Sequence, residues 1–399
     1  MAHLLFTIHH SPLPIHYHYI IAGAGCAGSS LLMRMMQEDF FRDKKILVLD
    51  HSTKNSNDRT WCFWEKEAGL FESIVYHRWP ILQFYSDSFS RELSIEPYQY
   101  KMIRGIDLYD HVRRMSAQHP NIEWRNETVK KVETGTSHAC VFTDQHAYQA
   151  AYVFNSIPFR DVQTPPSREN SKAYYLLQHF KGWLIETPGD HFDAGKATFM
   201  DFRVSQEKGV AFFYVLPVSP RKALVEYTLF TEQLLPEEMY DVALREYISS
   251  HLQLSDYSVQ HTEFGVIPMT NLRFPLQEGR VVFTGIAGGQ AKGSSGYAFR
   301  FIQKRTAAIV DSLVHKNSVD LRETTADKKF RLYDSVLLHV LHHRKMAGSE
   351  VFSRIFQHNP PQRVLRFLDN ETTLWEDLQI MRSVPTGIFL PAAIRELGS

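Results

Sequence analysis

The sequence contains little cysteine and no excess of charge, and both absences exclude classes of protein. Its 399 residues include three cysteines, Cys26, Cys62 and Cys140, which are far apart and form no CxxC pattern. A disulfide framework and a cysteine-based zinc site are therefore not expected, whereas a reducing, cytoplasmic compartment is. Lys and Arg together number 44, and so do Asp and Glu. This balance argues against a nucleic-acid-binding protein of the usual strongly basic kind.

Long apolar runs are also missing. The sequence has no stretch of 18 consecutive apolar residues, so we predict no membrane-spanning helix. The first 19 residues lack a basic start and an unbroken apolar run, and we interpret them as a short extension before the first strand, not as a signal peptide. These absences leave contact with a membrane surface open.

Aromatic side chains, by contrast, are abundant. The chain has 27 Phe, 18 Tyr and 6 Trp, which make up 13% of it, within an apolar fraction of 44%. Such a composition excludes a disordered chain and supplies material for a sizeable core. An aromatic-rich core accounts for these residues, and a large apolar ligand is the alternative.

A glycine motif follows the first predicted strand. Gly23, Gly25 and Gly28 form a Gly-x-Gly-x-x-Gly sequence between an apolar run and a helical pattern, and a second buried strand ends at Asp50. In this context the glycines allow a pyrophosphate to approach, the helix N-terminus offers free N–H groups, and the acid accepts hydrogen bonds from a ribose. The pattern predicts a dinucleotide site, with an ordinary turn as the alternative. It does not decide between FAD and NAD.

A second glycine-rich turn lies far along the chain, before a helix expected to begin at about Tyr297. From this region we assign five residues to the cofactor site, namely Gly285, Gly289, Gly293, Gly296 and Tyr297. Flavoproteins of the aromatic-hydroxylase architecture have a comparable turn, whose helix N-terminus faces the flavin ring and favours an anion. By that analogy, two such turns favour FAD over NAD. The Gly-Asp pair common at this turn is replaced here by Thr284-Gly285.

A glutamate interrupts the apolar strand predicted over 224–228. A carboxyl group in such surroundings is desolvated, which raises its pKa and keeps it protonated, so Glu226 is a candidate acid. The same residue on an alternating strand also suits the surface of a sheet. The spacing leaves both interpretations open.

These features together resemble the lycopene β-cyclase family over about residues 17–395. The segments that carry the resemblance are GAGCAGSSLL (23–32), NDRTWCFWE (57–65), HRWP (77–80), MD (200–201), FFYVLPVSP (212–220), LVEYT (224–228), VIPMT (266–270), GIAGGQAKGSSGYAF (285–299) and RFLDNETTLWEDLQIM (366–381). Many family members have a second carboxylate directly after the essential Glu, where this chain has Tyr227. Asp201 therefore becomes a candidate second acid or orienting group.

The resemblance implies an α/β FAD-binding Rossmann-like fold of the flavin-hydroxylase type, with an interleaved mixed β-sheet substrate domain and a helical C-terminal region. We assign 17–70, 101–160 and 260–315 to the FAD-binding domain, 71–100 and 161–259 to the substrate domain, and 316–399 to the helical region.

The resemblance also implies the reaction. Lycopene, a linear C40 hydrocarbon, is cyclised at its ψ end groups to β-ionone rings, by way of γ-carotene to β-carotene, in carotenoid biosynthesis. Mass is unchanged, so the enzyme is an isomerase (intramolecular lyase). FAD is needed in its reduced form and acts by charge, with NADPH as a candidate reductant. The predicted residue for the acid step is Glu226.

A carbocation needs stabilisation without capture, which aromatic faces provide at about 0.5–2 kcal/mol per contact. The candidates for an aromatic wall around the substrate are Trp61, Phe63, Trp64, Phe213 and Tyr214, for each of which core packing is the alternative. Lycopene resides in a bilayer, so a peripheral contact with the membrane is expected. The apolar and basic stretch 337–345 is a candidate for that contact, with packing on the core as the alternative.

Two other functions are compatible with the same fold. One is a redox enzyme, either an FAD- and NADPH-dependent monooxygenase or an isoprenoid reductase, which would consume NADPH in proportion to product. The other is a non-catalytic carotenoid or lipid carrier.

Overall fold

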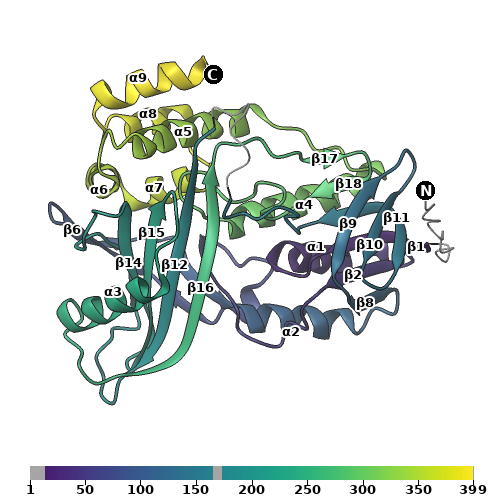
Figure 1. Ribbon diagram of the computed structural model, residues 1–399, viewed down its shortest axis with the longest axis horizontal. Coiled ribbons are helices and arrows are strands. Elements are labelled where there is room, and N and C mark those ends of the chain that lie inside the picture. Colours follow the sequence, from purple (N-terminus) through teal and green to yellow (C-terminus); the bar gives the residue numbers. More distant parts are fainter. Residues whose placement is uncertain (1–13, 165–172, 399) are drawn as a thin grey trace, which may run out of the picture.

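The computed structural model of the chain describes residues 14–164 and 173–398. Over these ranges the strands form three sheets, and the last part of the chain forms a group of helices at one end of the molecule (Figure 1). Most of the predicted N-terminal extension lies in residues 1–13, outside the described part. The first strand begins at Ile15, three residues before the predicted apolar run.

The first sheet carries the glycine motif. Its spatial order is β17-β18-β11-β1-β2-β8, with β10 and β9 paired beside β11. β18, β11, β1, β2 and β8 run parallel, which requires crossover connections. The strands are β1 (Ile15–Ala22), β2 (Ile46–Asp50), β8 (Ile122–Asn126), β9 (Val129–Thr134), β10 (Ala139–Thr143), β11 (Ala147–Asn155), β17 (Gln277–Glu278) and β18 (Val281–Phe283).

Both faces of this sheet are covered. The helices α1 (Cys26–Met36), α2 (Gly105–Ser116) and α4 (Phe299–Lys316) pack on one face, and the β9–β11 meander covers the other. On β1, Ile21 packs toward the helices while Ile20 packs toward the meander. Burial on both faces explains why β1 and β2 are continuous apolar runs and not alternating ones.

The second sheet has the order β16-β12-β15-β14-β13-β5-β6. It is antiparallel except between β13 and β5. The helix α3 (Glu237–Ser250) covers one face. The strands are β5 (Ile81–Tyr85), β6 (Ser90–Ser94), β12 (Tyr175–Glu186), β13 (Lys196–Asp201), β14 (Val210–Ser219), β15 (Lys222–Thr231) and β16 (Ser258–Thr270).

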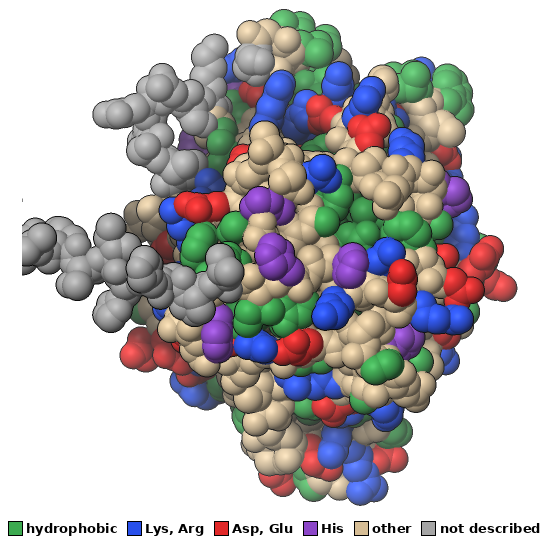
Figure 2. Space-filling view, turned by 90° about the vertical axis from the view of Figure 1, so that its right-hand side faces the viewer, with side chains coloured by type: hydrophobic (Ala, Val, Ile, Leu, Met, Phe, Trp, Pro, Cys, Tyr) green, Lys and Arg blue, Asp and Glu red, His purple; other side chains and the backbone are tan. Residues whose placement is uncertain are grey.

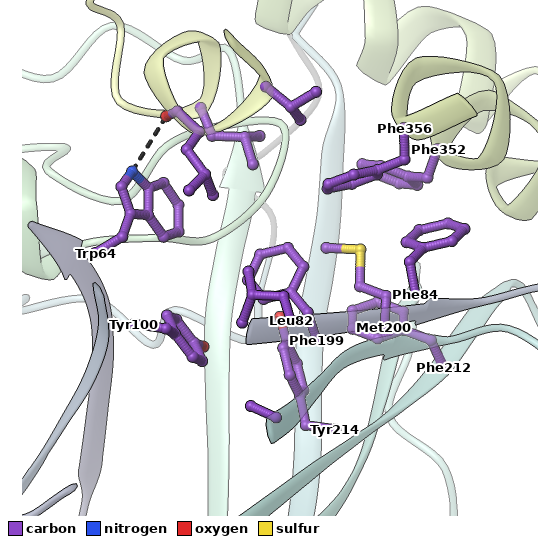
Figure 3. Packing of buried hydrophobic residues seen from close by; sticks show 14 of the residues in the cluster. Trp64, Leu82, Phe84, Tyr100, Phe199, Met200, Phe212, Tyr214, Phe352 and Phe356 are labelled. Atoms are coloured by element: carbon purple, nitrogen blue, oxygen red, sulfur yellow. Dashed lines mark hydrogen bonds between the residues drawn. The ribbon is translucent and has the colours of Figure 1, made fainter. Parts of the chain in front are cut away.

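The opposite face of the second sheet holds an aromatic core. Figure 3 shows Phe199 and Tyr214 near Trp64 and Tyr100, while Phe352 and Phe356 lie above Phe84 and Phe212. Phe199 and Tyr214 belong to the second sheet. Trp64 and Tyr100 belong to a small third sheet, which consists of β3 (Thr60–Glu65), β7 (Gln99–Arg104) and β4 (His77–Trp79). Many of the abundant aromatics are therefore core residues.

The C-terminal region is helical, as predicted. It consists of α5 (Thr325–His342), α6 (Gly348–His358), α7 (Pro361–Leu368), α8 (Leu374–Met381) and α9 (Thr386–Leu397). Thr324 and Thr373 begin α5 and α8 with capping boxes, in which each threonine exchanges hydrogen bonds with an acid three residues later. In α5, Leu338 and Val340 are fully buried, so the stretch 337–345 packs largely on the core.

The α/β class with a helical C-terminal region is confirmed. The domain bounds stay a prediction, and one of them divides an element: the range 260–315 that we assigned to the FAD-binding domain includes most of β16, which pairs along its length in the second sheet. None of the helices described is long and apolar enough to cross a membrane. On the face in Figure 2, Lys and Arg are interspersed with Asp and Glu, in keeping with the zero net charge.

Candidate active site

A cavity of about 460 Å³ lies where the first two sheets meet. Its walls come from the carboxyl ends of β1 and β2, from β3, from one face of the second sheet, and from the turn before α4. It brings together residues from the two glycine-rich turns with the face of the second sheet that carries Glu226. Segments more than 250 residues apart in sequence, such as Gly25 and Gly296, thus line one space.

The Gly-x-Gly-x-x-Gly turn beside the cavity has a backbone that requires glycine at two of its positions. Gly23 has a φ of +94°, and a Cβ on Gly28 would lie 2.0 Å from the carbonyl oxygen of Gly23. The backbone N–H of Ala24 donates to Asp50 Oδ2 at 2.7 Å, which ties the acid to the turn. Gly23, Gly25 and Asp50 line the cavity.

The N-terminus of α1 faces the same space. The helix begins at Cys26, and no side chain in the described ranges caps it, so its first N–H groups are available to an anion. Cys26 and Ala27 line the cavity, and the first turn contains no acidic residue. This arrangement suits a diphosphate group.

The distal turn contributes two of its four predicted glycines. Gly285 and Gly296 have positive φ angles of +58° and +70° and line this cavity. Gly289 and Gly293 line a separate cavity of about 630 Å³. Tyr297 lines the first cavity, and α4 begins just after it, at Phe299.

One residue of the cavity wall has a buried acceptor without a hydrogen-bond partner. The Oε1 atom of Gln178 on β12 is buried and has no hydrogen-bond partner among the described residues. A Cβ on Gly296 would lie 1.9 Å from this atom, so glycine is required beside it. Gln178 lines the cavity. The residues present therefore fit a dinucleotide whose ring system brings a hydrogen-bond donor to this point.

Glu226 projects from β15 into the cavity. Burial raises the pKa of its carboxyl well above the ordinary range, and the negative charge of Glu263 raises it further. Thr228 Oγ1 donates to Glu226 Oε1 at 2.8 Å, and this hydrogen bond lowers the pKa of Glu226. The predicted acid thus lies in surroundings that favour its protonated form.

Glu263 is a site residue that the sequence reasoning missed. It lies on β16, is 6% exposed, and lines the cavity. Burial raises the pKa of its carboxyl, while the hydrogen bond from Thr60 Oγ1 to Glu263 Oε2, at 2.7 Å, lowers it. Its sequence signal was a glutamate that opens the strand motif EFGVIPMT. Only the strand pairing brings it toward Glu226.

The five predicted aromatic residues separate into two groups. Trp61 and Tyr214 line the cavity, and Tyr214 shares a hydrogen bond of 3.0 Å with Tyr297 through the two hydroxyls. Phe63 is stacked on a core residue at 4.0 Å between ring centroids, and Trp64 donates its Nε1–H to a carbonyl in α7, as Figure 3 shows.

Phe213 and Asp201 lie on the α3 side of the second sheet. Phe213 stacks on Tyr247 of α3, with ring centroids 3.9 Å apart. Asp201 is fully buried, and its carboxylate accepts hydrogen bonds from Tyr247 Oη and Arg203 Nη2, each at 2.7 Å. The structure does not bring Asp201 to the cavity, because its contacts hold it against α3.

Cys62 and Tyr100 also line the cavity, and the sequence reasoning did not assign them to it. Burial raises the pKa of both well above their usual values, and the charge of Glu226 adds to each shift. Both groups are therefore neutral. Within the described ranges no cluster of His, Cys, Asp or Glu is arranged to hold a metal ion.

Comparison with known proteins gives a consistent result. Residues 19–392 match the sequence model of the lycopene cyclase protein family. The chain is 24% identical over 303 residues to a lycopene beta-cyclase from Pantoea ananas, and this alignment covers 71% of each of the two chains. Among solved structures, it resembles a geranylgeranyl bacteriochlorophyll reductase-like protein from Thermoplasma acidophilum, with a TM-score of 0.64, 12% identity, and coverage of 96% and 99% of the two chains.

A flavoprotein/dehydrogenase from Cytophaga hutchinsonii is similar in fold, with a TM-score of 0.63, 10% identity, and coverage of 96% and 99%. These two likenesses concern the fold and agree with the predicted flavoprotein architecture. The family match covers nearly all of the described residues. The resemblance noted in the sequence segments is therefore confirmed, and the chain belongs to the lycopene cyclase family.

Proposed function

We propose that this chain is an FAD-dependent lycopene β-cyclase, an isomerase that converts the ψ end groups of lycopene to β-ionone rings by acid catalysis without net redox change. The observation that carries the proposal is the position of Glu226, a carboxyl with a raised pKa in a cavity that continues from a dinucleotide-binding turn. Membership of the lycopene cyclase family supports the class of substrate.

The reaction adds one proton and removes one. Protonation of C2 of the end group places a cation at C1, the C5=C6 double bond attacks to form the C1–C6 bond, and loss of the C6 proton restores a double bond. Glu226 is suited to donate the first proton because burial keeps it protonated at neutral pH. Trp61, Tyr214 and Tyr297 present aromatic faces in the same cavity, which stabilise a cation without attacking it.

The residues that would hold FAD are those of the two turns. Gly23, Gly25 and the first N–H groups of α1 suit the diphosphate, and Asp50 suits the adenosine ribose. Gln178 and the turn before α4 suit the flavin ring. When bound in its reduced form, the flavin supplies negative charge near the cation, and NADPH is the proposed reductant.

An apolar surface on the outermost helices suits contact with a membrane. The helices α8 and α9 expose several large apolar side chains, namely Leu374, Trp375, Leu378, Leu390, Ile394 and Leu397. Arg382 lies over the Trp375 ring at 5.8 Å and places a cation beside this surface. Aliphatic side chains with tryptophan and a basic rim are typical of peripheral membrane binding. We infer that lycopene is drawn from the bilayer on this side.

The test is conversion by the purified protein. The FAD-loaded protein is incubated anaerobically with lycopene liposomes, a reductant and D₂O, and the products are identified by absorption and mass. We expect γ-carotene and β-carotene with one deuterium per ring. Consumption of NADPH in proportion to product would instead indicate a reductase or monooxygenase. Lycopene that binds but stays unchanged would indicate a carrier.

A further inference from the structure

The pairing of three strands brings two glutamates to either side of one glycine. Gly182 on β12 pairs with Glu226 on β15 and with Glu263 on β16. Residues in register across a sheet project to the same face, so both carboxyl side chains leave the sheet on the cavity side. A Cβ on Gly182 would lie 3.1 Å from Glu263 Cγ and 3.1 Å from Leu224 Cδ1. The missing side chain therefore leaves the space into which Glu263 extends.

The two carboxyl groups interact with each other. The negative charge of Glu263 raises the pKa of Glu226, so ionising both at once is unfavourable in this buried space. Among the described residues, the hydrogen bonds to their oxygens come from two neutral hydroxyls, those of Thr228 and Thr60. Repulsion between the two charges therefore favours the state in which one carboxyl is protonated and the other ionised.

The surroundings of the two groups differ. Glu263 lies near the positive charge of Arg59, which lowers its pKa, as well as near Asp58, which raises it. The other titratable groups that face Glu226 are Cys62, Tyr100, Tyr214 and Tyr297, and the pKa values of all four are raised, so they are neutral. Glu263 is therefore the member that ionises first, and Glu226 is the one that keeps the proton.

We propose that Glu226 and Glu263 form an acid–base pair, in which Glu226 gives its proton to C2 of the lycopene end group and the Glu263 carboxylate takes the proton released from C6. The proton that enters the hydrocarbon is replaced by the one that leaves it, so the pair and the substrate balance over one ring closure. Release of the C6 proton from Glu263 to solvent, and uptake of a solvent proton by Glu226, reset the pair. This inference rests on the proposed function and assigns the final base within it.

The experiment compares Glu263→Gln, Glu263→Asp and the control Glu238→Gln, whose glutamate is exposed on α3. We expect Glu263→Gln to retain FAD and to lower the rate of cyclisation by about 100-fold or more. Its residual product should contain ε or γ rings, because a proton is then lost from C4 or the C5 methyl group. Glu263→Asp should restore part of the rate and the β ring, and Glu238→Gln should behave like the wild type.

A second measurement does not depend on cyclisation. Infrared difference spectra follow the carbonyl stretch of a protonated, buried carboxyl during a pH titration of the FAD-loaded wild type. In Glu263→Gln the signal of Glu226 should titrate at lower pH, because the repelling charge is gone. An unchanged titration, or a Glu263→Gln enzyme with the wild-type rate and only β rings, overturns the proposal. A wild type that makes no cyclic carotene overturns the proposed function, while the spectra still decide whether the pair shares a proton.

Discussion

The hydrogen bond between Thr60 and Glu263 offers a test of the proposed acid–base pair, because its removal changes the pKa of Glu263 and leaves both carboxyl groups in place. Thr60 Oγ1 donates to Glu263 Oε2 at 2.7 Å and favours the ionised form of Glu263. A hydrogen bond to a charged group contributes about 1.5–3 kcal/mol. At 1.36 kcal/mol per pKa unit, Thr60→Val should raise the pKa of Glu263 by roughly 1–2 units.

The consequence for activity follows from the proposed role of Glu263 as the base. Since the base must be ionised, kcat/KM should fall on the acidic side of its pH profile, and that limb should move to higher pH by the same 1–2 units. At a fixed pH on this limb, kcat/KM should be about 10- to 100-fold lower than in the wild type. The assay is the initial rate of β-carotene formation from lycopene liposomes across the pH range.

Thr228→Val is the matched counterpart, because Thr228 donates to Glu226 at 2.8 Å and lowers its pKa. Its removal should raise the pKa of Glu226 and extend the alkaline limb, where the acid loses its proton. Flavin content and the melting temperature verify that both variants are folded. The reasoning is refuted if both substitutions move the same limb, or if folded Thr60→Val has the wild-type profile.

Four further outcomes are expected. Gly28→Val should abolish FAD binding, followed by flavin absorbance, because a Cβ there would lie 2.0 Å from the Gly23 carbonyl oxygen. Trp375→Ser should weaken cosedimentation with vesicles by about tenfold, since a buried large apolar side chain contributes roughly 1.5–3 kcal/mol, and unchanged binding would exclude α8 from the contact. Asp201→Asn should lower the melting temperature, with a cost of about 1–3 kcal/mol, but leave the ratio of ring types unchanged. Glu226→Gln should raise the melting temperature at pH 9 and leave it unchanged near pH 4. The pKa of Glu226 is raised in the folded protein, so the protonated carboxyl contributes its full stability below the unfolded-state pKa of about 4.3. That stability is lost as the pH rises through the raised folded-state pKa, and glutamine, which cannot ionise, avoids the loss.

The nucleotide-binding half of the site could be predicted from the sequence because its signals are local. The turn at Gly23 to Gly28 depends on the backbone freedom of glycine over a few adjacent residues, and the strand that ends at Asp50 follows within the same βαβ unit. The apolar context of Glu226 likewise belongs to its own strand. The glycine turn and the apolar neighbours of Glu226 can therefore be recognised from a short segment of sequence alone.

The placement of single side chains on the second sheet depended on tertiary structure. Tyr214 and Phe213 are adjacent, yet alternation along β14 sends the first into the cavity and the second against α3. Asp201 faces α3 for the same reason, although its residue type suits an acid. The sequence of a single strand does not indicate which of its two faces a helix covers and which faces a cavity.

The sequence by itself determined the glycine turns, the helical C-terminal region and the family, and it pointed to Glu226 as the candidate acid. Only the tertiary structure decided that Glu263 stands across Gly182 from that acid, because the register of β16 on β12 and of β12 on β15 is set by side-chain packing between strands distant in sequence. A shift of one residue in either pairing would send one of the two carboxyls to the opposite face of the sheet. The partner of the acid is therefore a property of the folded sheet and not of any one segment.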